Sequence, residues 1–222
     1  MRVRIPKRPS STLWDHNGHY HDYLLRRLPA QAGRALDVGC GTGAFARRLA
    51  ERAESVDAVD VSPQMIAAAR ASAAGVPNVR WLLGDVLTLE LEAGGYDIVT
   101  AIASVHHLPL ASGLARLATL VCPGGSLAIL GLYREAALPD YVAGALAIPV
   151  DTAVGIGKAA RRTLGTSKGS SPAGPTAAMP VRDPSATLRQ VRAEARRLMP
   201  GARIHRHLFY RYSLLWQRPE RF

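Results

Sequence analysis

The sequence predicts a doubly wound α/β domain, and three observations carry that prediction. Short apolar segments alternate with helical segments from residue 34 to residue 132. A glycine turn, GCGTG at residues 39–43, follows the first apolar segment. At 222 residues with 48% hydrophobic composition, the chain is long enough for one substantial core and too short for two full domains. We therefore expect a parallel sheet covered by helices on both faces.

Each expected element follows from local sequence. The expected strands of the sheet are RALDV (34–38), SVDAVD (55–60), VRWLLG (79–84), YDIVTA (96–101) and SLAILGL (126–132). The expected helices between them are FARRLAERA (45–53), PQMIAAARASAA (63–74) and LASGLARLATLVCPGG (110–125), the last ended by its Pro-Gly-Gly turn. Ser62 is the expected N-cap of the second helix, with Pro63 at its first position.

The two ends of the chain and one long connection are less regular. Residues 12–28 are expected to begin irregularly and to continue as a helix from about Tyr20. Residues 134–164 favour one or two helices interrupted at Pro149, and residues 165–182 have the Gly/Ser/Pro composition of a mobile loop. The expected closing elements are a helix beginning at Asp183 and Pro184 and two strands, ARIHRHLF (202–209) and YSLLWQR (212–218).

Composition restricts the class of protein. No apolar run reaches the roughly 18 residues of a membrane span, and the basic N-terminus lacks the apolar stretch of a secretory signal, so we expect a cytoplasmic protein without a membrane partner. Cys40 and Cys122 are the two cysteines, which excludes a disulfide framework and a four-cysteine zinc site. His16, His19 and His21 have no carboxylate pair beside them, so we expect no metal.

The net charge of +11 is unevenly distributed. Residues 9–133 hold nine basic and eleven acidic residues, whereas residues 134–222 hold fifteen and six. Six of those fifteen are Arg189, Arg192, Arg196, Arg197, Arg203 and Arg206. Two interpretations stay open: a nucleic-acid partner for the C-terminal third, or an arginine-rich composition that raises the charge without any partner.

The glycine turn lies where open α/β sheets bind ligands. A strand ending at Val38 and a helix beginning near Ala44 place it at the carboxyl edge of the first strand, where glycines allow close backbone approach. GCGTGA also fits the dinucleotide fingerprint, and Asp60 suits the ribose of either a dinucleotide or a nucleoside ligand. Asp37 and Asp85 add two further acids at this edge, and three acids suit a cationic ligand better than a diphosphate.

Five segments in order resemble the motifs of one family: LDVGCGTG, VDVSPQMIAAAR, GDVLTL, YDIVTAIASVHHL and LVCPGGSLAIL. They look like those of the class I S-adenosylmethionine-dependent methyltransferases, particularly the small-molecule and quinone-ring branch. The resemblance implies a Rossmann-like seven-stranded sheet with an antiparallel last strand. It also implies S-adenosylmethionine as cofactor, S-adenosylhomocysteine as product and a small, apolar or aromatic acceptor.

The resemblance also implies site residues. Asp37, Gly39, Cys40, Gly41 and Gly43 are expected around the methionine moiety of the cofactor. The adenosine is expected against Asp60, Val61, Met65, Asp85 and Val86, with the backbone of Ala101 and Ile102 beneath the methionine carboxyl group.

The domain is then divided into four parts. Residues 1–30 form an expected N-terminal lid and residues 34–133 the cofactor-binding core. Residues 134–182 form an insertion that caps an acceptor site or builds a satellite core, and residues 183–222 close the domain. In the lid, Tyr20 with Trp14 or His16 is expected to close the pocket; the alternative is a surface helix with a half-buried aromatic stripe.

His106 and His107 follow the fourth strand, where the transferred methyl group should point. Either is a candidate general base for a hydroxyl acceptor, or a packing residue. The alternatives to a small-molecule methyltransferase are an RNA or DNA methyltransferase, a cofactor-binding protein without turnover and a dehydrogenase. The segment AIASVHHLP lacks the Asn/Asp-Pro-Pro-aromatic motif of adenine-amine methyltransferases. The accepting atom and the oligomeric state stay open.

Overall fold

Seven strands form one sheet in the part of the chain that the structure describes, which is residues 16–73, 76–134, 183–208 and 210–220 of a computed structural model. The elements are α1 (His16–Leu25), β1 (Ala32–Val38), α2 (Ala44–Ala50), β2 (Ala53–Asp60), α3 (Pro63–Ala71), β3 (Val79–Leu83), β4 (Tyr96–Ile102), the short 3₁₀ helix η1 (Val105–His107), α4 (Leu110–Leu120), β5 (Val121–Leu132), α6 (Leu188–Leu198), β6 (Arg203–Arg206) and β7 (Arg211–Gln217).

The strand order is β3-β2-β1-β4-β5-β7-β6. Strands β1 to β5 pair in parallel, whereas β7, the last strand in the chain, pairs antiparallel with both β5 and β6. This confirms the Rossmann-like seven-stranded sheet. The strand order reverses between β1 and β4, and in open α/β sheets such a switch point leaves a crevice beyond the carboxyl ends of the two strands.

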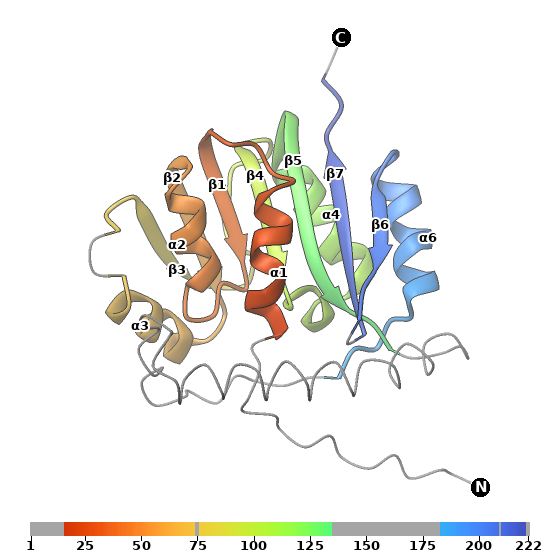
Figure 1. Cartoon of the computed structure of the whole chain (residues 1–222), viewed down its shortest axis with the longest axis horizontal. Helices are drawn as coiled ribbons and strands as arrows, with labels where there is room; N and C mark the ends of the chain where they lie inside the picture. The colour runs from red at the N-terminus through yellow and green to blue at the C-terminus, as the bar shows by residue number, and fades with distance from the viewer. Residues whose placement is uncertain (1–15, 74–75, 135–182, 209, 221–222) are drawn as a thin grey trace, which may run out of the picture.

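The helices cover both faces of the sheet, and Figure 1 shows α1 and α2 in front of it with α4 behind. On the front face Leu24 of α1 and Leu49 of α2 are fully buried in one cluster with Ile98 of β4. On the other face Leu117 of α4 and Val191 of α6 are buried in a second cluster. Burial of a leucine side chain contributes about 1.5–3 kcal/mol, so the two clusters fix the helices on the sheet.

Two helix starts show how local sequence sets the boundaries. The Ser62 cap is confirmed: its Oγ accepts a hydrogen bond from Met65 N at 3.3 Å, and Pro63 occupies the first position. The predicted start of the last helix at Pro184 is wrong, because α6 begins at Leu188. Thr187 Oγ1 accepts from Gln190 N, and the Gln190 side chain accepts from Thr187 N, which forms a capping box.

The predicted Pro-Gly-Gly helix end is also wrong. Helix α4 stops at Leu120, and β5 begins at the next residue, five positions before the expected strand. Val121 pairs with Tyr96, and Ser126 pairs with Ile98, so residues 122–125 form a bulge in β5. The register of the β4–β5 ladder therefore shifts across the bulge, and pairing continues from Ser126. The other four strands of the parallel sheet agree with the prediction within two residues at each end.

Helix α1 begins at His16, earlier than expected. Trp14, the expected helices after Arg134 and the expected loop at 165–182 lie outside the described residues. Within the described part of the chain, no helix combines the length and apolar character needed to cross a bilayer.

Candidate active site

A cavity of 410 Å³ opens at the carboxyl edge of the sheet, beside the switch point between β1 and β4. Residues far apart in the sequence meet there because parallel strands end at the same edge. Eleven predicted site residues line it: Asp37, Gly39, Cys40, Gly41, Asp60, Val61, Met65, Asp85, Val86, Ile102 and His107.

Asp37, near the end of β1, is 2% exposed. Thr100 Oγ1, on the paired strand β4, donates a hydrogen bond to Asp37 Oδ1 at 2.8 Å. Burial raises the pKa of Asp37 to about 7, against the lowering effect of the Thr100 hydrogen bond, and the nearby Asp60 charge raises it further. The cavity therefore contains a carboxyl group that changes charge near neutral pH.

Asp60, at the end of β2, connects two parts of the cavity wall. Its Oδ2 accepts from Gly41 N at 2.8 Å, and its Oδ1 accepts from Ser62 N at 2.9 Å. Each carboxylate oxygen can accept a second hydrogen bond, so ligand hydroxyl groups can still bind there. Asp85 accepts from Leu87 N at 2.9 Å through Oδ1, which turns the chain after β3.

Four of the five backbone N–H groups of the glycine turn, residues 39–43, have acceptors within the fold. Gly39 N and Cys40 N donate to Val59 O, and Gly43 N donates to Cys40 O at 2.9 Å. Gly41 N donates to Asp60, as described above. A dinucleotide pyrophosphate requires such donors, and among the described residues no lysine or arginine lines the cavity. The site therefore suits a cationic ligand and disfavours the dehydrogenase alternative.

Two glycines of the turn have different roles. Both have positive φ, +70° at Gly39 and +76° at Gly43. A Cβ on Gly39 would collide with the side chain of Ser104, so Gly39 allows the turns after β1 and β4 to approach each other. A Cβ on Gly43 would collide with the ring of Trp81, and Gly43 does not line the cavity as predicted. Its role here is to pack α2 against β3.

Tyr20 and Ala101 are also absent from the cavity wall. Tyr20 is buried, with its ring 5.0 Å from that of His207, while the next residue, His21, lines the cavity. Tyr20 shares a helical stripe with Leu24 that faces the sheet, and His21 lies about 100° around the helix. Ala101 is fully buried within β4, which leaves Ile102 to face the ligand space.

The two neighbouring histidines face different spaces. His107 lines the large cavity, whereas His106 lines a smaller one together with Tyr212. Their rings are 4.1 Å apart. Burial lowers the pKa of His106 to about 4, assisted by His107 and Arg211, and its buried Nδ1 has no hydrogen-bond partner in the described chain. Of the two predicted candidates, His107 is the one that lines the large cavity, whereas His106 faces the smaller space.

Sequence reasoning missed further parts of the wall, including His21, Phe45, Ala103 and Ser104. Ala103 has φ +52°, a left-handed conformation that is uncommon for a non-glycine residue. Ser104 Oγ donates to Val38 O at 2.7 Å and joins the turns after β4 and β1. The signal for Ala103 and Ser104 was available, because residues directly after a strand at a switch point face the crevice.

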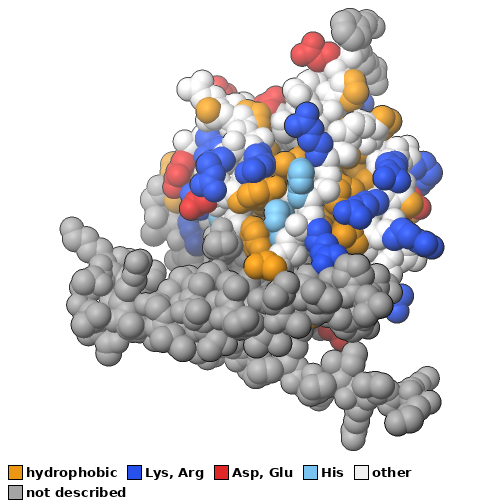
Figure 2. All heavy atoms as spheres, turned by 45° about the vertical axis from the view of Figure 1, so that its right-hand side comes forward, with side chains coloured by type: hydrophobic (Ala, Val, Ile, Leu, Met, Phe, Trp, Pro, Cys, Tyr) orange, Lys and Arg blue, Asp and Glu red, His pale blue; other side chains and the backbone are white. Residues whose placement is uncertain are grey.

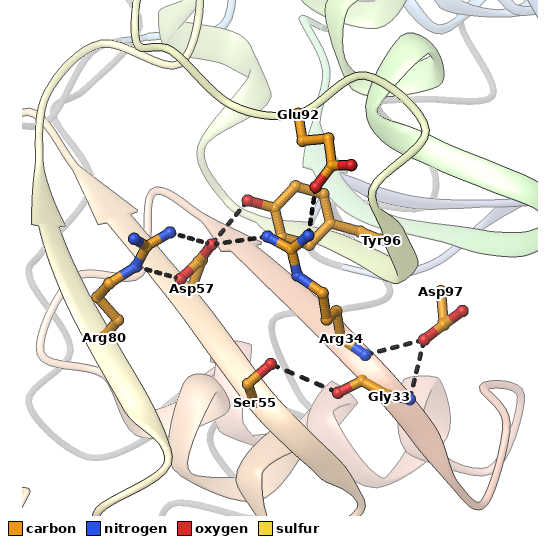
Figure 3. A network of polar contacts seen from close by, with 8 residues as sticks. All are labelled: Gly33, Arg34, Ser55, Asp57, Arg80, Glu92, Tyr96 and Asp97. Carbon is orange, nitrogen blue, oxygen red and sulfur yellow. Dashed lines mark hydrogen bonds and ion pairs between the residues drawn. The ribbon is translucent and has the colours of Figure 1, made fainter.

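A second group of acids lies toward the amino ends of the same strands (Figure 3). Arg80 donates to both oxygens of Asp57 at 2.7 and 2.8 Å, and Tyr96 OH donates at 2.7 Å. Burial alone raises the pKa of Asp57, but the hydrogen bonds from Arg80 and Tyr96 hold it below its usual value. Asp97 accepts from Gly33 N and Arg34 N, each at 2.8 Å. These acids already have partners.

The switch-point cavity and its acids define the class of protein, and the comparisons agree: the chain belongs to the S-adenosylmethionine-dependent methyltransferases, class I. A family described as methyltransferase domain matches residues 35–125. An uncharacterized methyltransferase of Mycobacterium tuberculosis is 35% identical over 207 residues, covering 93% of this chain and 98% of the relative.

More distant similarities are shorter or structural. A ubiquinone biosynthesis O-methyltransferase of Xanthomonas axonopodis pv. citri is 34% identical over 120 residues, or 52% of this chain and 50% of the relative. The crystal structure of a SAM-dependent methyltransferase from Aquifex aeolicus has a TM-score of 0.57 at 19% identity, covering 89% of this chain and 88% of that one. The latter shows a shared fold across nearly the whole chain.

Proposed function

We propose that this enzyme methylates a small, apolar or aromatic acceptor that carries a hydroxyl group. The observation that carries the proposal is the switch-point cavity, which has three carboxylates and, within the described residues, no lysine or arginine in its wall. A ligand with an ammonium group and a sulfonium fits such a wall. Space is also available, since a Cβ built on Gly41 meets nothing within 4 Å.

Each acid has a proposed partner on the cofactor. Asp60 accepts from the ribose hydroxyl groups through its remaining lone pairs. Asp37, in its ionised form, faces the ammonium group of the methionine moiety. Asp85 accepts from the exocyclic amine of the adenine, with Met65 and Val86 packing on the ring.

S-adenosylmethionine supplies a methyl carbon that its sulfonium already activates. The chain has to hold the acceptor oxygen in line with that carbon and to exclude water. His107 lines the cavity at the end of the switch-point turn, and we propose that its imidazole accepts the hydroxyl proton. The Xanthomonas relative is named as an O-methyltransferase, which supports an oxygen acceptor.

The basic C-terminal third does not by itself favour a nucleic-acid acceptor. Arg189, Arg192 and Arg196 of α6 are exposed. On the face drawn in Figure 2, however, basic side chains form separate groups with hydrophobic and histidine side chains between them. A continuous basic stripe, which a phosphate backbone requires, is not seen on this face.

The test is formation of S-adenosylhomocysteine from S-adenosylmethionine, measured by mass spectrometry with a panel of simple phenols and, in parallel, with total RNA. We expect product with at least one phenol, and a loss of about 100-fold in turnover in His107→Ala at unchanged S-adenosylhomocysteine affinity. A matched control is His205→Ala, an exposed histidine of β6 outside the cavity wall. Product formed only with RNA would contradict the proposal.

A further inference from the structure

Among the side chains described for helix α1, His21 lines the cofactor cavity. His21 is 9% exposed, and its ring lies 4.9 Å from that of Phe45, edge to face, where both residues line the cavity. The position of His21 therefore depends on where α1 lies and on how α1 is rotated about its axis.

Apolar packing turns one face of α1 toward the sheet. Tyr20 and Leu24 lie in the front cluster and set the helical phase, but burial is non-directional and leaves a range of rotation about that phase. The ion pair of Asp22 with Arg48 is exposed, and exposed pairs contribute little. A directional contact is needed to fix the rotation of the helix.

Such a contact exists at the hairpin that joins β6 to β7. The ring of His207 lies 5.0 Å from that of Tyr20 and 4.9 Å from that of Tyr23. Ser213 Oγ, fully buried in β7, is 2.8 Å from His207 Nε2 and 3.2 Å from Tyr23 OH. A serine hydroxyl has one proton, so Ser213 donates to one neighbour and accepts from the other. The hydrogen bonds therefore form one directed chain, either from Tyr23 to His207 or from His207 to Tyr23. This chain connects α1 to the hairpin.

Two further contacts stiffen the connection. The guanidinium of Arg27 lies 3.6 Å above the Tyr23 ring centroid and donates to Tyr23 O at 2.9 Å, which restrains the tyrosine further. In the hairpin, His207 N donates to Arg211 O at 2.8 Å. The turn that carries His207 is thus itself closed by a hydrogen bond.

We propose that His207 is a positioning residue for the methyltransferase site: with Ser213 it fixes the rotation of α1 and so places His21 in the wall of the cofactor cavity. The proposal rests on the proposed function, because it assumes that the cofactor occupies this cavity. His207 itself does not touch the cavity, so it acts through α1.

The test compares S-adenosylhomocysteine binding by calorimetry with hydrogen exchange of residues 16–25, in wild type and four variants. His207→Leu should weaken binding about tenfold and speed amide exchange in α1, because the directed chain is broken. His207→Gln retains a polar group that reaches Ser213 and should restore most of the affinity. Tyr23→Phe keeps the ring and loses the hydroxyl, so it should show a smaller loss in the same direction.

The matched control is His205→Leu, which changes an exposed histidine two residues earlier and should behave as wild type. The imidazole ¹⁵N signals of His21 should shift on ligand binding in wild type and much less in His207→Leu. Wild-type affinity and α1 exchange in His207→Leu and Tyr23→Phe would overturn the proposal, as would an equal loss in His205→Leu. Absence of binding in the wild type would instead refute the proposed function.

Discussion

The two edges of the sheet carry acids in opposite settings. Toward the amino ends of the strands, Asp57 receives both arms of the Arg80 guanidinium and Glu92 pairs with Arg34 (Figure 3). At the carboxyl edge, Asp60 and Asp85 accept from backbone N–H groups, and Asp37 accepts from a threonine hydroxyl. Arginine neutralises the first group, whereas no described arginine or lysine forms an ion pair with the second.

We interpret this difference as one between acids that stabilise the fold and acids that are available to bind a ligand. A carboxylate held by arginine has its charge satisfied in the folded chain. A carboxylate held only by neutral donors keeps an uncompensated charge, which a cationic ligand can satisfy. Asp57 and Asp60 lie three residues apart on the same strand and belong to different groups.

The largest expected effect comes from breaking the arginine-held group. Asp57→Ala leaves Arg80 and Tyr96 without their shared acceptor, and should lower the free energy of unfolding by about 1–3 kcal/mol, chiefly because the buried Tyr96 hydroxyl loses its partner. Chemical denaturation measures this, with Glu54→Ala, an exposed acid of β2, as the control near zero. Affinity for S-adenosylhomocysteine should be preserved in the folded variant. If Asp57→Ala instead lost affinity for S-adenosylhomocysteine at unchanged stability, Asp57 would belong with the ligand-binding acids.

The pH dependence of S-adenosylhomocysteine binding tests the role of Asp37 at the carboxyl edge. The pKa of Asp37 is about 7 in the folded chain, above its unfolded value, so the carboxyl group is protonated below pH 7 and cannot face an ammonium group. Affinity for S-adenosylhomocysteine should fall as pH falls through 7, approaching about tenfold per unit. The same shift means that the Asp37 contribution to stability decreases as pH rises from about 4 to 7.

Calorimetry between pH 5.5 and 8.5 measures the binding effect, and Asp37→Asn should flatten it. Adenosine, which lacks the amino-acid group, is the matched ligand and should bind with little dependence on pH in this range. An equally steep profile for adenosine would mean that another group is responsible.

Sequence alone predicted much of this arrangement and missed what depends on tertiary contacts. The three carboxyl-edge acids were visible because each follows or ends an apolar strand segment. VDAVD could not reveal that Asp57 is held by arginine, since Arg80 becomes its neighbour only through the pairing of β2 with β3. The sequence predicted Tyr20, with Trp14 or His16, at the pocket, whereas the helical phase set by Leu24 places Tyr20 in the core.

A smaller effect is expected for the acid that faces the adenine. Asp85→Ala should weaken S-adenosylhomocysteine by about fivefold, the value of one hydrogen bond from an exocyclic amine. S-inosylhomocysteine, in which that amine is replaced by oxygen, supplies the comparison. Wild type should discriminate between the two ligands, and the variant should not. If Asp85→Ala still discriminated between the two ligands, the exocyclic amine of the adenine would not bind at Asp85.

The smallest effect is expected for Arg34→Gln. The Arg34 side chain is 40% exposed and that of its partner Glu92 is 67% exposed, so the change should lower the free energy of unfolding by no more than about 1 kcal/mol. Denaturation in low and high salt measures it, and the difference from wild type should shrink as salt rises. A larger, salt-independent loss would show that Arg34 matters chiefly through its contact with the Tyr96 ring.

Calorimetric titration of the wild type and Asp60→Ala with S-adenosylhomocysteine and NADH, at pH 8, tests whether the carboxyl-edge acids form the cofactor site of a methyltransferase. We predict wild-type binding of S-adenosylhomocysteine, a loss of about 100-fold in Asp60→Ala and no comparable binding of NADH. Tight binding of NADH, or S-adenosylhomocysteine affinity that does not depend on Asp60, would contradict the claim.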